Sequence, residues 1–116
     1  CFNDMYFFPD ITARLSAAAG MRATVGLILL DFPSVWAGDA DAYVQKGLEV
    51  HDQYRNHQLI RTAFAPHAPY SVSNAPLERI RVLADELEIP IHMHVHETRD
   101  EIKQGLQQHG NRPLQR

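Results

Sequence analysis

The sequence has little or none of several features that mark common protein classes. It contains one cysteine, Cys1, among 116 residues, so no internal disulfide framework can form. Lys and Arg number 11 against 14 Asp and Glu, and this lack of a basic surplus argues against a protein that binds nucleic acid or anionic membranes. The longest mostly apolar stretch, from Ala23 to Leu30, is far shorter than the roughly 18 residues of a membrane span.

Other absences narrow the choice further. The first residues include Asp4 and no basic region, so we expect no signal peptide and a cytoplasmic protein. There is no phosphate-binding loop, no Gly-rich dinucleotide fingerprint and no Gly-x-Ser-x-Gly nucleophile turn. What remains, with 45% hydrophobic and 22% charged residues, is the composition of an ordinary soluble globular protein.

Strand-like and helix-like segments alternate along the chain. Residues 1–8 are typical of the end of a strand and its loop, and runs rich in apolar residues predict strands over 22–30, 59–64 and 90–95. Capping residues and apolar spacing predict helices between them and after the last one. The predicted helices begin near Pro9, at Asp39 or Asp41, at Ser73 or Asn74, and at the capping box that starts with Thr98.

The apolar spacing also predicts which side of each helix is buried. The expected buried positions are Ile11, Leu15, Ala18 and Ala19 in the first helix, Tyr43, Gly47, Val50 and Tyr54 in the second, and Leu77, Ile80, Ala84 and Leu87 in the third. Glycines after the first and last helices, Gly20 and Gly110, are expected to end them.

The order of elements predicts an α/β fold with a parallel sheet. Strands recur about every 30 residues, as in successive βαβ units. Both a doubly wound sheet and part of a (β/α)8 barrel have this order. Because a full barrel takes roughly 250 residues, the chain would be about half of one, and both of its ends are expected to be truncated.

Histidines are concentrated in the last predicted strand. His92, His94 and His96 are two residues apart, so on a regular strand they share one face. Imidazole is a common metal ligand, and Glu97 follows at the strand-to-helix junction, where a carboxylate can move protons beside a metal-bound water. A histidine on a strand is more often a hydrogen-bonded structural residue, so not all three need bind a metal.

A second histidine lies in a stiff loop after the preceding strand. His67 stands between Pro66 and Pro69, which restrict the backbone and would hold the imidazole in a fixed direction for a substrate. The alternative is a stiff connection with an incidental histidine. Weaker candidates are Asp4, Asp31 and Trp36, which follow strands, while surface positions are expected for His51, His57 and His109.

Four segments together resemble a known family. FAPHAPYSVS (64–73), PIHMHVHETRDEI (90–102), CFNDMYFFPD (1–10) and GMRA (20–23) are similar to the amidohydrolase superfamily, in particular the 5-methylthioadenosine/S-adenosylhomocysteine deaminase group and its relatives the triazine hydrolases. The resemblance covers essentially the whole chain. It implies a metal-dependent (β/α)8 barrel, of which residues 1–116 would be the part from the end of strand 2 to helix 5.

The resemblance also implies roles for individual residues. It makes His94 a metal ligand, Glu97 the proton-transferring acid that contacts the substrate ring, and His67 a substrate-binding residue. The cofactor would be Zn²⁺, with its remaining ligands outside this chain, since one imidazole cannot make a zinc site. His92 and His96 are not required by the family pattern.

The implied activity is hydrolytic deamination of an adenine nucleoside with release of ammonia. Some family members carry an arginine in strand 3 for a polar substrate tail, and Leu27 is expected at that place here, which favours methylthioadenosine or adenosine over S-adenosylhomocysteine. A triazine or guanine amidohydrolase of the same fold and a catalytically inactive half-barrel are the alternatives. The intact protein would be the enzyme, with the rest of the barrel required and a homo-oligomer left open as an option.

Overall fold

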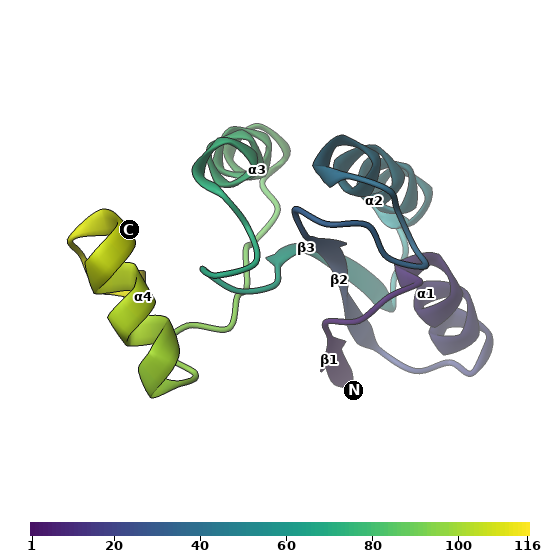
Figure 1. Ribbon diagram of the computed structural model, residues 1–116. Coiled ribbons are helices and arrows are strands. Elements are labelled where there is room, and N and C mark those ends of the chain that lie inside the picture. Colours follow the sequence, from purple (N-terminus) through teal and green to yellow (C-terminus); the bar gives the residue numbers. More distant parts are fainter.

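The computed structural model describes residues 1–116 and alternates strands with helices in the predicted order as far as α3, after which α4 follows without an intervening strand (Figure 1). Its elements are β1 (Phe2–Asp4), α1 (Pro9–Ala18), β2 (Ala23–Leu29), α2 (Ala40–Tyr54), β3 (Ile60–Pro66), α3 (Asn74–Leu87), α4 (Arg99–His109) and a short 3-10 helix, η1 (Pro113–Gln115). The strands form one parallel sheet in the order β1-β2-β3. Helices α1, α2 and α3 pack along this sheet, whereas α4 stands apart beyond β3 (Figure 1).

The central strand is buried on both faces, as its run of apolar residues predicts. Leu27 packs against Gly47 of α2, where an added Cβ would lie 3.2 Å from the Leu27 Cβ. The neighbouring residue Ile28 belongs to the opposite face because successive side chains on a strand alternate. The sheet therefore has one face toward α2 and an opposite face, which the His92 side chain approaches at Gly26.

The helix ends follow the predicted capping residues. Asp39 caps α2 by accepting a hydrogen bond from the Ala42 N–H, and Thr98 caps α4 by accepting one from the Glu101 N–H. Gly20 and Gly110 adopt the left-handed conformation after α1 and α4. None of these helices combines the length and apolar character needed to cross a membrane.

The prediction of the buried side of α1 is wrong. Ile11 and Leu15 are 40% and 57% exposed, and the buried residues are instead Pro9, Ala13 and Ser16. Small side chains let α1 lie close to β2, so the face with the larger apolar residues points away. Leu87 at the end of α3 is also exposed, contrary to prediction, while the four predicted positions on α2 are buried.

The predicted strand over residues 90–95 is reduced to a single bridge between Ile91 and Phe64. Phe64 N–H donates to Pro90 O and His92 N–H donates to Phe64 O, so parallel pairing begins as expected. The next donor on β3 would be Pro66, which has no N–H, and the ladder cannot continue. His94 N–H bonds to His67 O instead, and the segment leaves the sheet at this point.

Candidate active site

The predicted site residues lie at the carboxyl end of the parallel sheet. His67 follows β3 directly, and its N–H donates to Leu29 O at the end of β2, which fixes the loop to the sheet. Its Nδ1 is 2.9 Å from Ser71 Oγ, which leaves Nε2 for a ligand. Burial lowers the pKa of His67 below its usual value, His94 adds to the decrease, and Glu97 opposes it. The imidazole is therefore held in one orientation and favours the neutral form.

His94 lies beside His67. The two ring centroids are 5.5 Å apart with an interplanar angle of 77°. His94 is exposed, and its backbone is held by the bond from its N–H to His67 O. Two imidazoles from predicted motifs 27 residues apart in sequence thus meet at one place.

Glu97 reaches this pair through Tyr70. The Tyr70 hydroxyl donates to Glu97 Oε2 at 3.4 Å, and the Tyr70 ring packs edge-on against His67 with centroids 5.8 Å apart. Burial raises the pKa of Tyr70 above its usual value, and the charge and hydrogen bond of Glu97 raise it further. Tyr70 was not among the predicted site residues, although it lies within the FAPHAPYSVS segment that carried the resemblance.

A largely apolar cavity of about 400 Å³ opens beside the two histidines. It is lined by the turn after β1, the end of β2, and the loop after β3 together with His94. The lining residues are Met5, Tyr6, Phe7, Ile28, Leu30, Phe32, His67, Tyr70, Ser71 and His94. A cavity with apolar walls and a few convergent polar groups is the usual form of a small-molecule site.

His92 lies deeper on the same side of the sheet. Its Nδ1 is 3.0 Å from Asn3 Nδ2, and because an amide nitrogen only donates, the Nδ1 accepts and the proton is on Nε2. That Nε2 is buried and has no partner among these residues. Burial lowers the pKa of His92, His94 lowers it further, and Asp4 opposes the change.

His96 does not share the direction that a regular strand would give it. Its φ of 59° is left-handed, and its Nε2 accepts a bond of 3.4 Å from Leu114 N–H beside α4. The regular alternation that would place three histidines on one face therefore ends before His96.

The weaker candidates have structural contacts. Asp31 accepts a hydrogen bond from Ser73 N–H, and Trp36 is buried between Phe8 and Lys46. Of the three histidines expected at the surface, His109 is exposed, whereas His51 and His57 are half-buried and hydrogen-bonded. His51 bonds to Thr62, and His57 accepts from the N–H groups of Leu59 and Ile60 at the start of β3.

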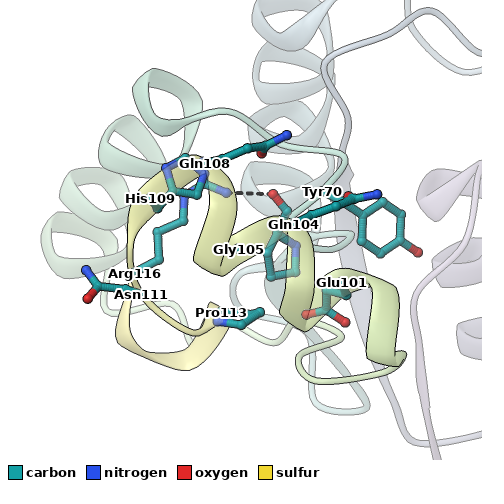
Figure 2. A pocket seen from close by; sticks show the side chains of 10 residues that line it. Tyr70, Glu101, Gln104, Gly105, Gln108, His109, Asn111, Pro113 and Arg116 are labelled. Atoms are coloured by element: carbon teal, nitrogen blue, oxygen red, sulfur yellow. Dashed lines mark hydrogen bonds between the residues drawn. The ribbon is translucent and has the colours of Figure 1, made fainter.

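The loop that carries His67 and Tyr70 is also tied to the end of the chain. Figure 2 shows Arg116, Tyr70 and Glu101 among the residues around one small pocket between this loop and α4. The Arg116 guanidinium donates to Pro69 O, Val72 O and Asn74 Oδ1. The pocket between these residues is only about 10 Å³, the room of one water molecule, so it is a packing contact rather than a ligand site.

Comparison with known proteins decides the family. The model of the amidohydrolase family matches residues 1–115. The chain belongs to the amidohydrolase family.

This amidohydrolase chain is 50% identical, over all of its 116 residues, to a 5-methylthioadenosine/S-adenosylhomocysteine deaminase of Saccharophagus degradans, of which it covers 26%. A zinc-bound structure described as an adenosine deaminase from Xanthomonas campestris superposes with a TM-score of 0.95 at 49% identity, covering 97% of this chain and 26% of the other. The chain thus spans about a quarter of the length of such relatives.

A more distant structure shares the fold. A mutant of the atrazine chlorohydrolase TrzN from Arthrobacter aurescens, with zinc and atraton, has a TM-score of 0.82 at 16% identity, covering 97% of this chain and 29% of that one. The structure of this amidohydrolase chain is accordingly part of a (β/α)8 barrel, as predicted.

The amidohydrolase chain alone does not assemble a metal site. Zinc needs three or four ligands, and residues 1–116 contain no group of three His, Cys, Asp or Glu side chains close enough to hold a metal ion. His94 is nevertheless suited to supply one ligand, because its imidazole is exposed beside the cavity at the carboxyl end of the sheet.

Proposed function

We propose that residues 1–116 are part of one barrel domain of a zinc-dependent hydrolytic deaminase that acts on adenine nucleosides and releases ammonia. The observation that carries the proposal is the grouping of His94 beside His67, and of Glu97 joined to His67 through Tyr70, at the carboxyl end of the sheet next to an apolar cavity. The relatives named as deaminases, at about half identity across the whole chain, support it.

This chain would supply only part of the zinc site. His94 would supply one ligand, and the remaining ligands would come from other parts of the longer protein. When bound, a zinc ion supplies a Lewis acid that makes a water molecule a nucleophile near neutral pH. The contributions of this chain are to bind the substrate, to orient it, and to move protons.

Glu97 and His67 would divide the remaining work. Glu97 would transfer a proton to a nitrogen of the purine ring, which makes the neighbouring carbon easier to attack. His67, held by Ser71 and favouring its neutral form, would orient the substrate through Nε2. The Tyr70 hydroxyl keeps the Glu97 carboxylate close to this pair.

The structure changes the argument for which adenine nucleoside is the preferred substrate. Leu27 faces α2 rather than the cavity, so its identity cannot select against a charged substrate tail as the sequence suggested. The cavity wall that this chain contributes nevertheless contains no Lys or Arg, and it presents apolar side chains such as Met5, Phe7 and Ile28. This wall favours a neutral, apolar 5′ substituent, as in methylthioadenosine, over the charged amino-acid tail of S-adenosylhomocysteine.

A substrate panel on the full-length, zinc-loaded protein tests the proposal. Ammonia release would be measured with methylthioadenosine, adenosine, S-adenosylhomocysteine, guanine and a triazine. We expect release from the first two, with a higher kcat/KM for methylthioadenosine than for S-adenosylhomocysteine. Release from guanine or the triazine alone would assign a different amidohydrolase activity, and no release from any compound would support a catalytically inactive barrel.

The Glu97→Gln variant tests the assigned proton transfer. It keeps the size of the side chain and removes the ionisable carboxyl, so we expect kcat to fall by about 100-fold or more while bound zinc stays at the wild-type level. Glu49→Gln, an exposed carboxyl on α2, is the matched control and should keep wild-type kcat. Loss of zinc from Glu97→Gln would instead make Glu97 a ligand or a structural residue.

A further inference from the structure

The turn that precedes α4 is strained. His96 has a φ of 59°, one of three left-handed residues other than glycine in the chain. This conformation is costly for a residue with a Cβ and persists only where the surroundings hold it. Because Glu97 is the next residue, whatever holds this turn also sets the direction in which the Glu97 side chain leaves the backbone.

A buried carboxylate holds the turn. Glu101, in the first turn of α4, is 3% exposed. Its Oε1 accepts from His96 N–H at 2.9 Å, and its Oε2 accepts from Glu97 N–H at 2.7 Å. In an ordinary capping box the glutamate bonds back to the N–H of the capping residue, here Thr98. Glu101 instead accepts from the N–H groups one and two residues before Thr98, so both of its carboxylate oxygens bond to the strained turn.

We propose that Glu101 is a positioning residue that fixes the left-handed turn at His96 and thereby aims Glu97 at the substrate. The inference rests on the proposed role of Glu97 as the proton-transferring acid. Glu101 is not on the cavity wall and does not itself meet the substrate. It acts through two backbone N–H groups, which stay fixed while the Glu97 side chain remains exposed and free to react.

The loop that contains His67 and Tyr70 is also held by the end of the chain, after α4. After α4 the chain turns back, and Arg116 bonds to Pro69 O (Figure 2) and to Val72 O, on either side of Tyr70. Glu97 is tied to the start of α4 by Glu101, and the loop of His67 is tied by Arg116 to the segment that follows α4. A shift of the turn at His96 therefore moves Glu97 relative to His67, which stays in place.

The Glu101→Gln variant tests this role in the full-length, zinc-loaded enzyme. Glutamine has the same shape, but its amide nitrogen cannot accept a hydrogen bond, so one of the two backbone N–H groups loses its partner. We expect kcat to fall at least about tenfold, as a misplaced reacting group should give, with KM and zinc content close to wild type. The control is Asp39→Ala, which removes the cap of α2 and should lower stability without lowering kcat.

A pair of variants at His96 separates backbone geometry from imidazole chemistry. Asparagine tolerates the left-handed conformation well, whereas a β-branched residue does not. We expect His96→Asn to keep kcat within about twofold of wild type and His96→Val to lose activity as Glu101→Gln does. Equal loss in both His96 variants would show that the imidazole itself is needed, and would overturn the proposal that the turn is what matters.

Hydrogen exchange gives a readout that does not depend on activity. In Glu101→Gln we expect the peptide that covers residues 94–99 to exchange faster than in wild type, while peptides of α2 and β3 are unchanged. If the wild-type enzyme deaminates no nucleoside, the proposed function fails and this exchange still tests the hold on the turn. Unchanged exchange, or a kcat within about twofold of wild type in an active enzyme, would overturn the role of Glu101.

Discussion

Tyr70 links His67 to Glu97 and so adds a side-chain contact between the two recognisable motifs. Its ring packs on His67 and its hydroxyl donates to Glu97, although the two partners are 30 positions apart in the sequence. Burial raises its pKa above the ordinary value of 10.0, and the charge and hydrogen bond of Glu97 act in the same direction. A raised pKa keeps the hydroxyl protonated, and therefore able to donate, through the whole neutral and mildly alkaline range.

This direction of shift predicts the alkaline behaviour of the enzyme. The folded-state pKa of Tyr70 lies above its unfolded value, so the contribution of the protonated hydroxyl is complete below pH 10 and is lost only as the pH rises through the folded pKa. We expect the full-length enzyme to show no loss of kcat attributable to Tyr70 below pH 10. Tyr70→Phe keeps the ring on His67 but should lower kcat by about 3- to 10-fold at neutral pH, the effect of one hydrogen bond.

The measurement is the pH dependence of kcat for wild type and Tyr70→Phe between pH 6 and the alkaline limit of stability. Tyr54→Phe, which removes a hydroxyl with no hydrogen bond from a tyrosine of α2 outside the cavity wall, is the control. A Tyr70→Phe enzyme with wild-type kcat throughout would show that the contact with Glu97 contributes nothing to the reaction.

At the scale of elements, Gly26 explains how β1, β2 and the histidine segment come so close together. A Cβ at this position would lie 2.4 Å from Asp4 O, 2.9 Å from Ala65 Cβ and 3.1 Å from His92 Nε2. Any side chain would therefore push apart the two neighbouring strands and the imidazole of His92. Glycine in the middle of a strand is otherwise unfavourable, and here it marks a close approach.

The Gly26→Ala variant should accordingly lose stability by about 1–3 kcal/mol, the typical cost of overpacking. Gly38→Ala is the matched control, because an added Cβ there meets nothing within 4 Å and its backbone is not left-handed. We expect its stability to stay within about 0.5 kcal/mol of wild type. Denaturant unfolding of both variants in the full-length protein checks the difference, and equal stabilities would contradict the packing at Gly26.

Element by element, the sequence predicts what depends on local patterns. The caps Asp39 and Thr98 are confirmed because a capping side chain acts within three residues of itself. The buried side of α1 was not predictable, since the apolar stripe through Ile11 and Leu15 is the larger one and only the packing shows that it faces away. The break after Ile91 depends on Pro66 in a neighbouring strand, which a reading of residues 90–95 alone does not include.

In the site, too, features set by local sequence patterns were predictable and contacts between distant segments were not. His67 and Glu97 stand out because each follows a predicted strand at the end where barrel enzymes place their chemistry. Their roles in a reaction remain predictions. The contributions of Tyr70, Asn3 and Glu101 come from contacts between segments, and no spacing within the sequence specifies which atoms meet.

At the scale of the whole molecule, these residues leave much apolar surface open. The stripe of α1 and the turns at the carboxyl end of the sheet expose large apolar side chains, among them Leu15, Tyr6, Phe32 and Val35. Strand β1 has a partner on one side only, and α4 stands away from the sheet (Figure 1). In a closed barrel such an edge and such exposed apolar side chains are covered by further strands and helices.

A polypeptide of residues 1–116 produced alone should therefore associate or aggregate rather than fold as a stable monomer. The free edge of β1 offers unpaired backbone groups, and the exposed side chains of α1 and the turns offer apolar contacts, to other copies. Size-exclusion chromatography with light scattering, together with thermal unfolding at several concentrations, checks this expectation against the full-length protein as control. A monomer with a sharp, concentration-independent unfolding transition would show that the three strands and their helices form a sufficient core by themselves.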